Sequence, residues 1–352
     1  MTTGVHHEGK RRVPAGLILF HLAALAAVGA PLAFAVAALS GIEHRWVDIF
    51  AQFTAPALMA ALALAAGFLA LRRRRWAIAA SVAAALLLTA VWPEWFPPVG
   101  RPEAGAPTVR LYSANVWTGN TDAAAVAASI RRADPDIVVL VEIGTVADQR
   151  MLAALESFPY RLGRPALERP NRTARSVIAS RYPLTPLPGG GDGLNAGGAR
   201  VDTPLGPVNV VGVHLTRPWP FMPAEGQITQ ASALAARLRR LDGPVIVAGD
   251  FNSVSDARIG RQIKAQTGLV PAPGFPGTWP AALPSPLAVT IDQVWRSPDL
   301  ALLRRRVLAP VGSDHRPVLV EFTRAARPPA SPAARRDPSR GSPPPPRPPR
   351  TP

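Results

Sequence analysis

The sequence predicts a layered α/β domain that follows a group of membrane-spanning helices. In residues 107–324, short aliphatic runs typical of buried strands alternate with Ala-rich helical patterns, and four of these runs end in a polar residue. Three long apolar stretches precede residue 93, and each is close to the roughly 20 residues that a helix needs to cross a bilayer. These observations divide the chain into a membrane unit, a soluble α/β domain and short flanking segments.

The amino-acid composition restricts the chemistry. Cysteine is absent, which excludes disulfides, thiolate zinc sites and thiol nucleophiles, so any metal ion must be held by oxygen or imidazole ligands. The formal net charge is +16 at pH 7, and a basic domain can indicate a nucleic-acid or anionic-membrane partner. The only lysines, however, are Lys10 and Lys264, and Arg, Ala and Pro are all in excess. A compositional bias accounts for the charge, so we infer no nucleic-acid surface from it.

The membrane unit is expected over residues 1–92, with helices over about 14–40, 53–71 and 76–92. The third stretch is the shortest, but Trp76 and Trp92 stand at its ends, where interfacial aromatic residues are common. The alternative interpretation is a buried helical hairpin in a soluble protein, which the lengths of the stretches disfavour.

Basic residues next to short loops predict the orientation of these helices. Lys10, Arg11 and Arg12 precede the first helix, and the four arginines of 72–75 separate the second from the third. Such residues stay on the cytoplasmic side, which places everything after the third helix outside. "AFA" at 33–35 resembles a signal-peptide cleavage site, but cleavage there would leave the later residues on the same side. We therefore expect a multi-pass protein of the cell membrane with an extracytoplasmic domain.

Two segments of biased composition flank the soluble domain. Residues 93–106 read as a stiff, Pro-rich linker, which at roughly 3.1 Å per residue would keep the domain within about 45 Å of the bilayer. Residues 325–352 are rich in Pro and Arg and contain too few apolar residues to form a core. We expect this tail to be disordered.

The strands of the soluble domain end in residues that can carry chemistry. Strands are expected over 108–116, 136–143, 207–215 and 245–250, and later ones around "TIDQVW" and after "GSDHRP". A helix is expected over 121–133, with Asn120 or Thr121 as its cap. Ligands of layered α/β folds bind outside the strand ends, where several loops meet. We therefore expect one cleft to contain Asn115, Glu142, His214, Asp250, Asn252, Asp292, Asp314 and His315.

These residue types favour metal-assisted chemistry on phosphates. Carboxylates and amides are the oxygen ligands that Mg²⁺ or Mn²⁺ prefers, and the two histidines can act as acid, base or phosphate donor. The sequence has no G-x-S-x-G elbow and no G-x-x-x-x-G-K-[ST] phosphate loop. Taken singly, Asn115 and Asn252 could be turn residues, Asp292 a surface strand residue and His214 a core histidine.

The order of the motifs identifies a family resemblance. "YSANV", "VVLVEI", "VVGVHL", "VAGDFNS", "TIDQVW" and "GSDHRPV" resemble the endonuclease/exonuclease/phosphatase superfamily, which includes DNase I-like nucleases, sphingomyelinases and inositol-phosphate phosphatases. The resemblance covers residues 107–324 and implies a four-layer fold, in which two mixed β-sheets pack face to face between helices. Many relatives have Gln where this chain has Val141, but that Gln is not a ligand.

The resemblance also implies roles for the site residues. Glu142 would be the main ligand of Mg²⁺ or Mn²⁺, assisted by Asn115 and Asp314. Asp250 would orient or deprotonate the attacking water, with Asn252 holding a phosphate oxygen. His315, paired with Asp292, would stabilise the pentacoordinate phosphorus, and His214 would bind phosphate or assist the leaving group. The metal would neutralise phosphate charge and lower the pKa of a bound water.

The membrane helices and "GTWP" at 277–280 are similar to a membrane-anchored bacterial branch that includes proteins linked to glycopeptide resistance. That similarity suggests a lipid-linked phosphate or pyrophosphate as substrate and the bilayer as partner. A surface-anchored nuclease acting on DNA is an alternative, although the compact domain has no long insertion to grip a duplex. A non-catalytic cell-surface binding module is the other alternative. Arg181 and Trp279 are weaker candidates for substrate contact, and no protein partner can be inferred.

Overall fold

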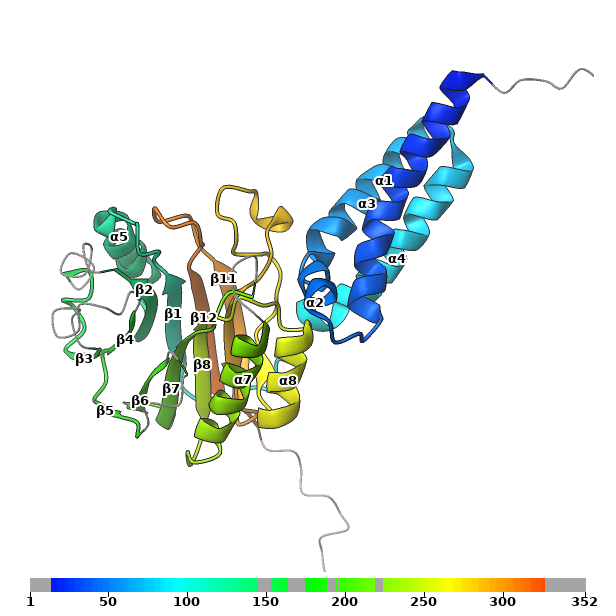
Figure 1. Cartoon of the computed structure of the whole chain (residues 1–352). Helices are drawn as coiled ribbons and strands as arrows, with labels where there is room; N and C mark the ends of the chain where they lie inside the picture. The colour runs from blue at the N-terminus through cyan, green and yellow to red at the C-terminus, as the bar shows by residue number, and fades with distance from the viewer. Residues whose placement is uncertain are drawn as a thin grey trace, which may run out of the picture.

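Two six-stranded mixed β-sheets pack face to face between outer helices, as the sequence predicts (Figure 1). The computed structural model describes residues 14–144, 153–163, 175–188, 194, 196–218 and 224–326. Most of the predicted disordered tail, from residue 327 onward, lies outside the described residues.

The first sheet is mixed, with one parallel pair, β1 and β2, at its centre. Its strands are, in spatial order, β11 (Leu300–Val307), β12 (Val318–Arg324), β1 (Val109–Asn115), β2 (Ile137–Ile143), β4 (Arg175–Ser180) and β3 (Tyr160–Leu162). The other pairings in this sheet are antiparallel.

The second sheet repeats this plan around the parallel pair β7 and β8. Its strands are, in spatial order, β5 (Leu184–Pro186), β6 (Ala196–Thr203), β7 (Gly206–His214), β8 (Val245–Asp250), β10 (Asp292–Arg296) and β9 (Val270–Pro271). A short 3-10 helix, η2 (Ser285–Leu287), lies in the connection between β9 and β10. Each sheet therefore has two parallel strands at its centre, and Asn115, Glu142, His214 and Asp250 stand at or next to their carboxyl ends.

Successive side chains along each strand point alternately to the core between the sheets and to the helices outside, which produces the four layers. Leu111 and Ile246 point into the core between the sheets, whereas Tyr112 and Val247 point outward to the helices. The helix α5 (Ala123–Ala133) covers the first sheet, and α7 (Ala224–Leu238) and α8 (Arg258–Thr267) cover the second (Figure 1). Because both faces of each sheet are covered, the central strands are apolar along their length and only their ends are free to carry polar groups.

A close approach between β7 and β8 explains the glycine that precedes Asp250. Gly249 has φ +139°, and a Cβ added there would lie 2.0 Å from the carbonyl oxygen of Val213. Only glycine fits at this position without displacing the backbone of β7. The "GD" dipeptide is therefore needed to bring the end of β8 close to its neighbour.

Four helices precede the sandwich and form an elongated unit beside it (Figure 1). They are α1 (Ala15–Leu39), α2 (Arg45–Ala51), α3 (Thr54–Ala70) and α4 (Arg74–Trp95). By length and composition α1 and α4 could each cross a membrane, and α2 with α3, which meet at a bend of 57°, would make a third span. Two or three membrane spans are therefore possible. His21, which has no obvious partner in the sequence, accepts a hydrogen bond from Nε1 of Trp76 and so joins α1 to α4.

The segment between α4 and β1 runs along the first sheet. The helix α4 continues to Trp95, into the segment expected to be a linker. Beyond it, the carbonyl oxygen of Val99 accepts a hydrogen bond from the backbone N–H of Leu302, and the N–H of Glu103 donates to the carbonyl of Arg324. These bonds hold the connecting segment against the first sheet.

Candidate active site

Strand register brings three of the predicted residues side by side. In the parallel pairing of β7 with β8, His214 lies opposite Asp250, and in the antiparallel pairing of β8 with β10, Asp250 lies opposite Asp292. Residues opposite one another on neighbouring strands are within reach of each other's side chains. The second sheet therefore presents one imidazole and two carboxylates in a row.

A local irregularity directs Glu142 toward this row from the first sheet. The pairing of β2 with β4 shifts register between Leu140 and Ile143, and Glu142 lies within the shift with φ 58°. A non-glycine residue in this left-handed region costs energy, and a bulge changes the direction in which a side chain points. The strain is located at the residue that the sequence predicts as the main metal ligand.

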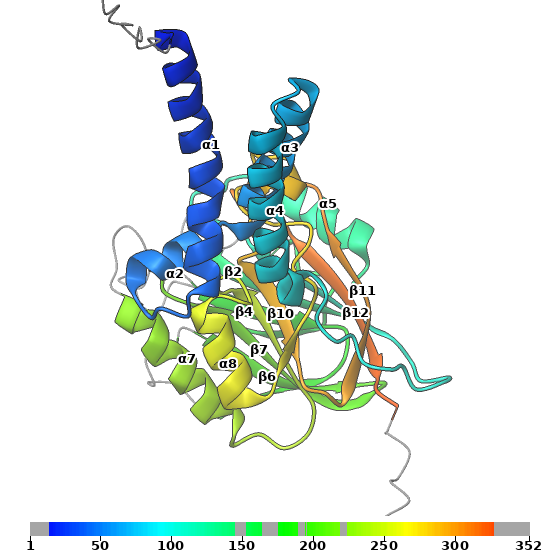
Figure 2. The same ribbon diagram turned by 90° about the vertical axis from the view of Figure 1, so that its right-hand side faces the viewer.

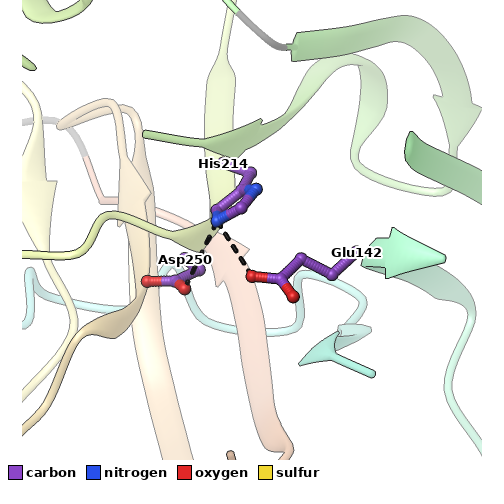
Figure 3. A group of neighbouring side chains, drawn as sticks. All are labelled: Glu142, His214 and Asp250. Carbon is purple, nitrogen blue, oxygen red and sulfur yellow. Dashed lines mark ion pairs between the residues drawn. The ribbon is translucent and has the colours of Figure 1, made fainter. Parts of the chain in front are cut away.

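Glu142, His214 and Asp250 meet where β2, β7 and β8 end (Figure 3). Nε2 of His214 lies 3.0 Å from Oε1 of Glu142 and 3.8 Å from Oδ2 of Asp250. The Asp250 side chain is 1% exposed, whereas those of His214 and Glu142 are about 20% exposed. The cluster is therefore open to solvent only on the side of His214 and Glu142.

Two amides hold the carboxylates of this cluster. Nδ2 of Asn115 donates to Oε1 of Glu142 at 2.9 Å and to Oδ2 of Asp250 at 3.0 Å. Asn252 donates its backbone N–H to Oδ1 of Asp250 at 2.8 Å, and its Nδ2 donates to the carbonyl oxygen of Leu215 at 2.9 Å. Asn252 also has a left-handed backbone, with φ 47°. Since Nδ2 of Asn252 also donates to Oδ2 of Asp250 at 3.3 Å, both side-chain amides orient acidic groups rather than forming only local turns.

His315 and Asp292 form a second, buried pair. Nδ1 of His315 donates to Oδ2 of Asp292 at 2.9 Å, which directs Nε2 toward Oδ2 of Asp250 at 3.9 Å and Oδ1 of Asp314 at 3.8 Å. Ser313 accepts the backbone N–H of His315 at 3.1 Å and donates its hydroxyl to the carbonyl oxygen of Asn115 at 2.8 Å. The "SDH" motif is thereby tied to the end of β1.

The charges of the cluster shift the pKa values of its members. Burial tends to raise the pKa of Glu142, but its hydrogen bond to His214 and the charge of that imidazole outweigh burial and lower it to about 2. Burial raises the pKa of Asp250 to about 6, against the opposing charge of His315. Burial opposes protonation of His315, but the charges of Asp292 and Asp250 raise its pKa to about 10. Burial opposes protonation of His214 too, but the hydrogen bond to Glu142 together with the charges of Asp250 and Glu142 outweighs burial and raises its pKa.

These residues border a cavity of about 390 Å³. Six of the eight predicted site residues line it: Glu142, His214, Asp250, Asn252, Asp314 and His315. The other two, Asn115 and Asp292, are each 1% exposed and lie behind the lining, where they hold the carboxylates and His315. The structure thus brings together all eight residues.

Of the two weaker candidates for substrate contact, Trp279 lines the cavity and Arg181 does not. Nε1 of Trp279 donates to Oδ2 of Asp314 at 3.2 Å, and Trp279 lines the cavity. Arg181 does not line it, because its guanidinium pairs with Asp134 at the end of α5.

Sequence reasoning missed two groups of cavity residues. Thr216, Arg217 and Trp117 follow strand ends that had already been singled out, so a wider reading of those ends could have found them. Ile49, Gln52 and Phe53 come from the helical unit, and no motif marks them.

The donor set fits a divalent cation. Glu142, His214 and Asp250 can each offer one ligand atom within 4.8 Å of the others, and so can Asp250, Asp292 and His315. Oδ1 of Asp292 is buried and has no hydrogen-bond partner in the described residues. Asn115 turns its NH₂ group toward the carboxylates while its oxygen accepts from the backbone N–H of Trp117, so its role as a ligand stays a prediction. Carboxylate oxygens suit Mg²⁺ or Mn²⁺, and the identity of the ion is not fixed by them.

Comparison with known proteins agrees with this geometry. The family model of the endonuclease/exonuclease/phosphatase family matches residues 112–315. The chain belongs to this family. Members are phosphatases and nucleases, and they generally use a divalent metal.

Solved structures show the same fold at low identity. The endonuclease/exonuclease/phosphatase of Bacteroides vulgatus matches with a TM-score of 0.52 and 16% identity, over 62% of this chain and 99% of that chain. The mannosyl-6-phosphatase Bt3783 of Bacteroides thetaiotaomicron VPI-5482 matches with a TM-score of 0.50 and 16% identity, over 61% of this chain and 99% of that chain. A search of the curated proteins gives no match.

Proposed function

We propose that this protein is a metal-dependent phosphoesterase that hydrolyses a lipid-linked phosphate or pyrophosphate at the outer face of a membrane. The observation that supports it best is the position of the cavity. The acidic and imidazole groups line a cavity that is also lined by Ile49, Gln52 and Phe53 of the helical unit. A substrate with a phosphate next to a hydrocarbon chain matches this mixture of polar and apolar groups.

Glu142 is the residue best placed to hold the cation, with Asp250 and His214 beside it. When bound, a divalent cation neutralises phosphate charge and lowers the pKa of a bound water. Because the bulge in β2 fixes Glu142 in position, the protein would not need to reorganise when the ion binds.

The surrounding side chains supply the remaining steps. Asp250, held by Asn115 and Asn252, accepts a proton as the water oxygen bonds to phosphorus. Protonated His315 donates from Nε2 to a phosphoryl oxygen, where negative charge increases in the transition state. His214 lies at the open side of the cluster, where it can donate a proton to the ester oxygen as the P–O bond breaks.

Arg217 supports a second phosphate position. Its exposed guanidinium lies 5.6 Å from the centre of the Trp279 ring, at the border of the cavity. Among the described residues no carboxylate lies within ion-pair distance of it. A guanidinium that has no carboxylate partner among the described residues and stands beside a phosphate site can bind a further anionic group, and this favours a pyrophosphate over a monophosphate.

A substrate panel tests the proposal. We expect the full-length protein, in liposomes with Mg²⁺, to release phosphate or head group from undecaprenyl pyrophosphate or a sphingomyelin-type phospholipid faster than it degrades single- or double-stranded DNA. The physical reason is that membrane binding presents a lipid at high effective concentration, whereas free DNA gains nothing from it. Efficient DNA degradation without hydrolysis of any lipid would instead favour a surface nuclease, and no hydrolysis at all would favour a binding module.

The proposed location has its own test. We expect alkaline phosphatase fused after residue 107 to be active and a cytosolic green fluorophore fused there to be dark, because the arginines of 72–75 keep their loop in the cytoplasm. The reverse pattern would place the catalytic domain inside the cell.

A further inference from the structure

The bend between α2 and α3 forms part of the catalytic cavity. The two helices meet at 57°, and Gln52 and Phe53 lie between them. Ile49, Gln52 and Phe53 are half-buried and line the same cavity as Glu142 and His315. We call these three residues the elbow.

An ion-pair cluster holds α2 against the catalytic domain. The guanidinium of Arg258, at the start of α8, lies 3.3 Å from a carboxylate oxygen of Asp48 and 3.3 Å from one of Glu43. Figure 2 shows α2 beside α7 and α8, away from the axis of α3. The side chains of Asp48 and Arg258 are about one-fifth exposed, so the Arg258–Asp48 pair is partly protected from solvent screening.

The elbow is continuous with an apolar part of the active site. Phe53 packs against a cluster formed by Val254, Ala257, Val289 and Ile291, and Trp279 packs against the same cluster. Val289, Ile291 and Trp279 also line the cavity. The cavity therefore has a polar side and an apolar side, and Phe53 of the helical unit contributes to the apolar side.

A second contact fixes the helical unit at the other side of the junction. The rings of Trp95 and Phe275 have centroids 4.6 Å apart, and the N–H of Gly274 donates to the carbonyl oxygen of Glu94 at 2.8 Å. A Cβ at Gly274 would lie 2.4 Å from the Glu94 side chain, so the two segments are closely packed. With α2 and α4 both docked, the elbow is a fixed wall of the cavity rather than a segment that only passes near it.

We propose that the elbow is the subsite for the hydrocarbon chain of the substrate, with Phe53 and Ile49 as the residues that select a lipid phosphate over a soluble one. This inference rests on the proposed function, since it assumes that the polar side of the cavity binds the phosphate. The phosphate lies at Glu142 and His315, and the first methylene groups lie along Phe53 and Ile49, between the helical unit and the cluster around Ile291. A short soluble ester uses only the polar side.

The lack of charge in the elbow and its position next to α3 favour a hydrocarbon chain as the group that binds there. The elbow residues are uncharged, and two of them are large apolar side chains left half-exposed in a water-accessible cavity. The same bend leads directly into α3, whose outer residues, such as Leu62, are exposed and apolar, as expected for a helix in contact with lipid. The elbow is therefore joined along the chain to an apolar helix surface of the kind that contacts lipid.

A series of chromogenic diesters tests the inference. Full-length protein in phosphatidylcholine vesicles is given ethyl, butyl, hexyl and octyl p-nitrophenyl phosphate with Mg²⁺, and kcat/KM is measured from p-nitrophenolate release. For the wild type we expect kcat/KM to rise about two- to four-fold per methylene over the first carbons, because each buried methylene stabilises the complex. For Phe53→Ala and Ile49→Ala we expect the rise to be at most half as steep on a logarithmic scale, with the ethyl ester hydrolysed within about two-fold of the wild-type rate.

Control variants separate the inference from a loss of folding and from the proposed function. Leu62→Ala shortens an exposed apolar side chain of α3 outside the cavity and should keep the wild-type dependence on chain length, while Phe53→Leu should restore most of it. A uniform fall for all esters in the elbow variants, an unchanged dependence, or an equal change in Leu62→Ala would overturn the inference. Wild-type protein that hydrolyses all esters equally, in a reaction lost on His315→Ala, would overturn the inference but leave the proposed function standing. Absence of any hydrolysis that depends on His315 would overturn both.

Discussion

Replacing His315 with Ala should lower kcat by about 10²- to 10³-fold while the protein stays folded, the usual effect of removing one preorganised donor to a transition-state charge. His315 is buried, and its Nδ1 is bound to Asp292, so its Nε2 is fixed toward the cavity. The nearby carboxylates raise its pKa to about 10, so it carries a proton at neutral pH. The measurement is single-turnover hydrolysis of a p-nitrophenyl diester, with circular dichroism to verify the fold.

Two further variants give this prediction a sharp control. Asp292→Asn keeps the shape of the partner but removes its charge, and we expect a smaller loss of about 10-fold, because His315 is still positioned by a hydrogen bond. Arg181→Ala removes a cation that the structure places outside the cavity, beside Asp134, and should leave kcat unchanged. Near-native rates in a well-folded His315→Ala variant would show that the site has been assigned to the wrong residues.

The fold and the members of the site could be predicted because both depend on local patterns. A run of apolar residues that ends in a polar residue can be recognised directly in the sequence. Parallel central strands bring the carboxyl ends of such runs to the same edge of a sheet. The parallel register of β7 and β8, which sets His214 beside Asp250, agrees with that pattern, whereas Asp292 stands opposite Asp250 at the start of the antiparallel strand β10. Their roles in catalysis stay predictions until they are measured.

Other features could not be predicted because they depend on contacts between distant segments. Glu142 reaches the cluster because the pairing of β2 with β4 contains a bulge, whereas the sequence around Glu142 predicts an uninterrupted strand. The cap of α5 is Asp122, whose side chain accepts the N–H of Ala125, rather than Asn120 or Thr121. Asn120 is instead used to bond the carbonyl oxygen of Val311, a partner far away in the sequence.

The contact between the helical unit and the cavity is the feature of the structure that the sequence predicted least. A Pro-rich segment between a membrane unit and a soluble domain is typical of a spacer, and its composition alone suggests a domain held at a distance. In the structure this segment is hydrogen-bonded to β11 and β12, and the elbow lines the cavity. No periodicity marks Ile49 or Phe53 as cavity residues, because both also fit an ordinary apolar helix end.

Glu142→Gln should abolish metal-dependent hydrolysis almost completely, with a loss in kcat of at least about 10²- to 10³-fold and at least about ten-fold weaker binding of Mg²⁺ or Mn²⁺. The replacement keeps the size of the side chain but removes the carboxylate that His214 and Asn115 hold in an ionised state, with its pKa lowered to about 2. The matched control is Glu103→Gln, which changes an exposed glutamate beside Arg324 at the carboxyl end of β12, outside the cavity lining, and should behave as the wild type.

Binding can be measured without activity, by calorimetry and by the rise in Tm on adding the ion. A ligand that binds only the folded protein stabilises it by an amount that grows with the ratio of its concentration to Kd. The wild type and Glu103→Gln should therefore gain thermal stability from Mg²⁺ or Mn²⁺, whereas Glu142→Gln should gain little at the same concentration. Equal stabilisation of all three proteins would place the cation elsewhere. Since Asp250, Asp292 and His315 form the second group of possible ligands, the ion would then be sought between β8 and β10 rather than at the end of β2.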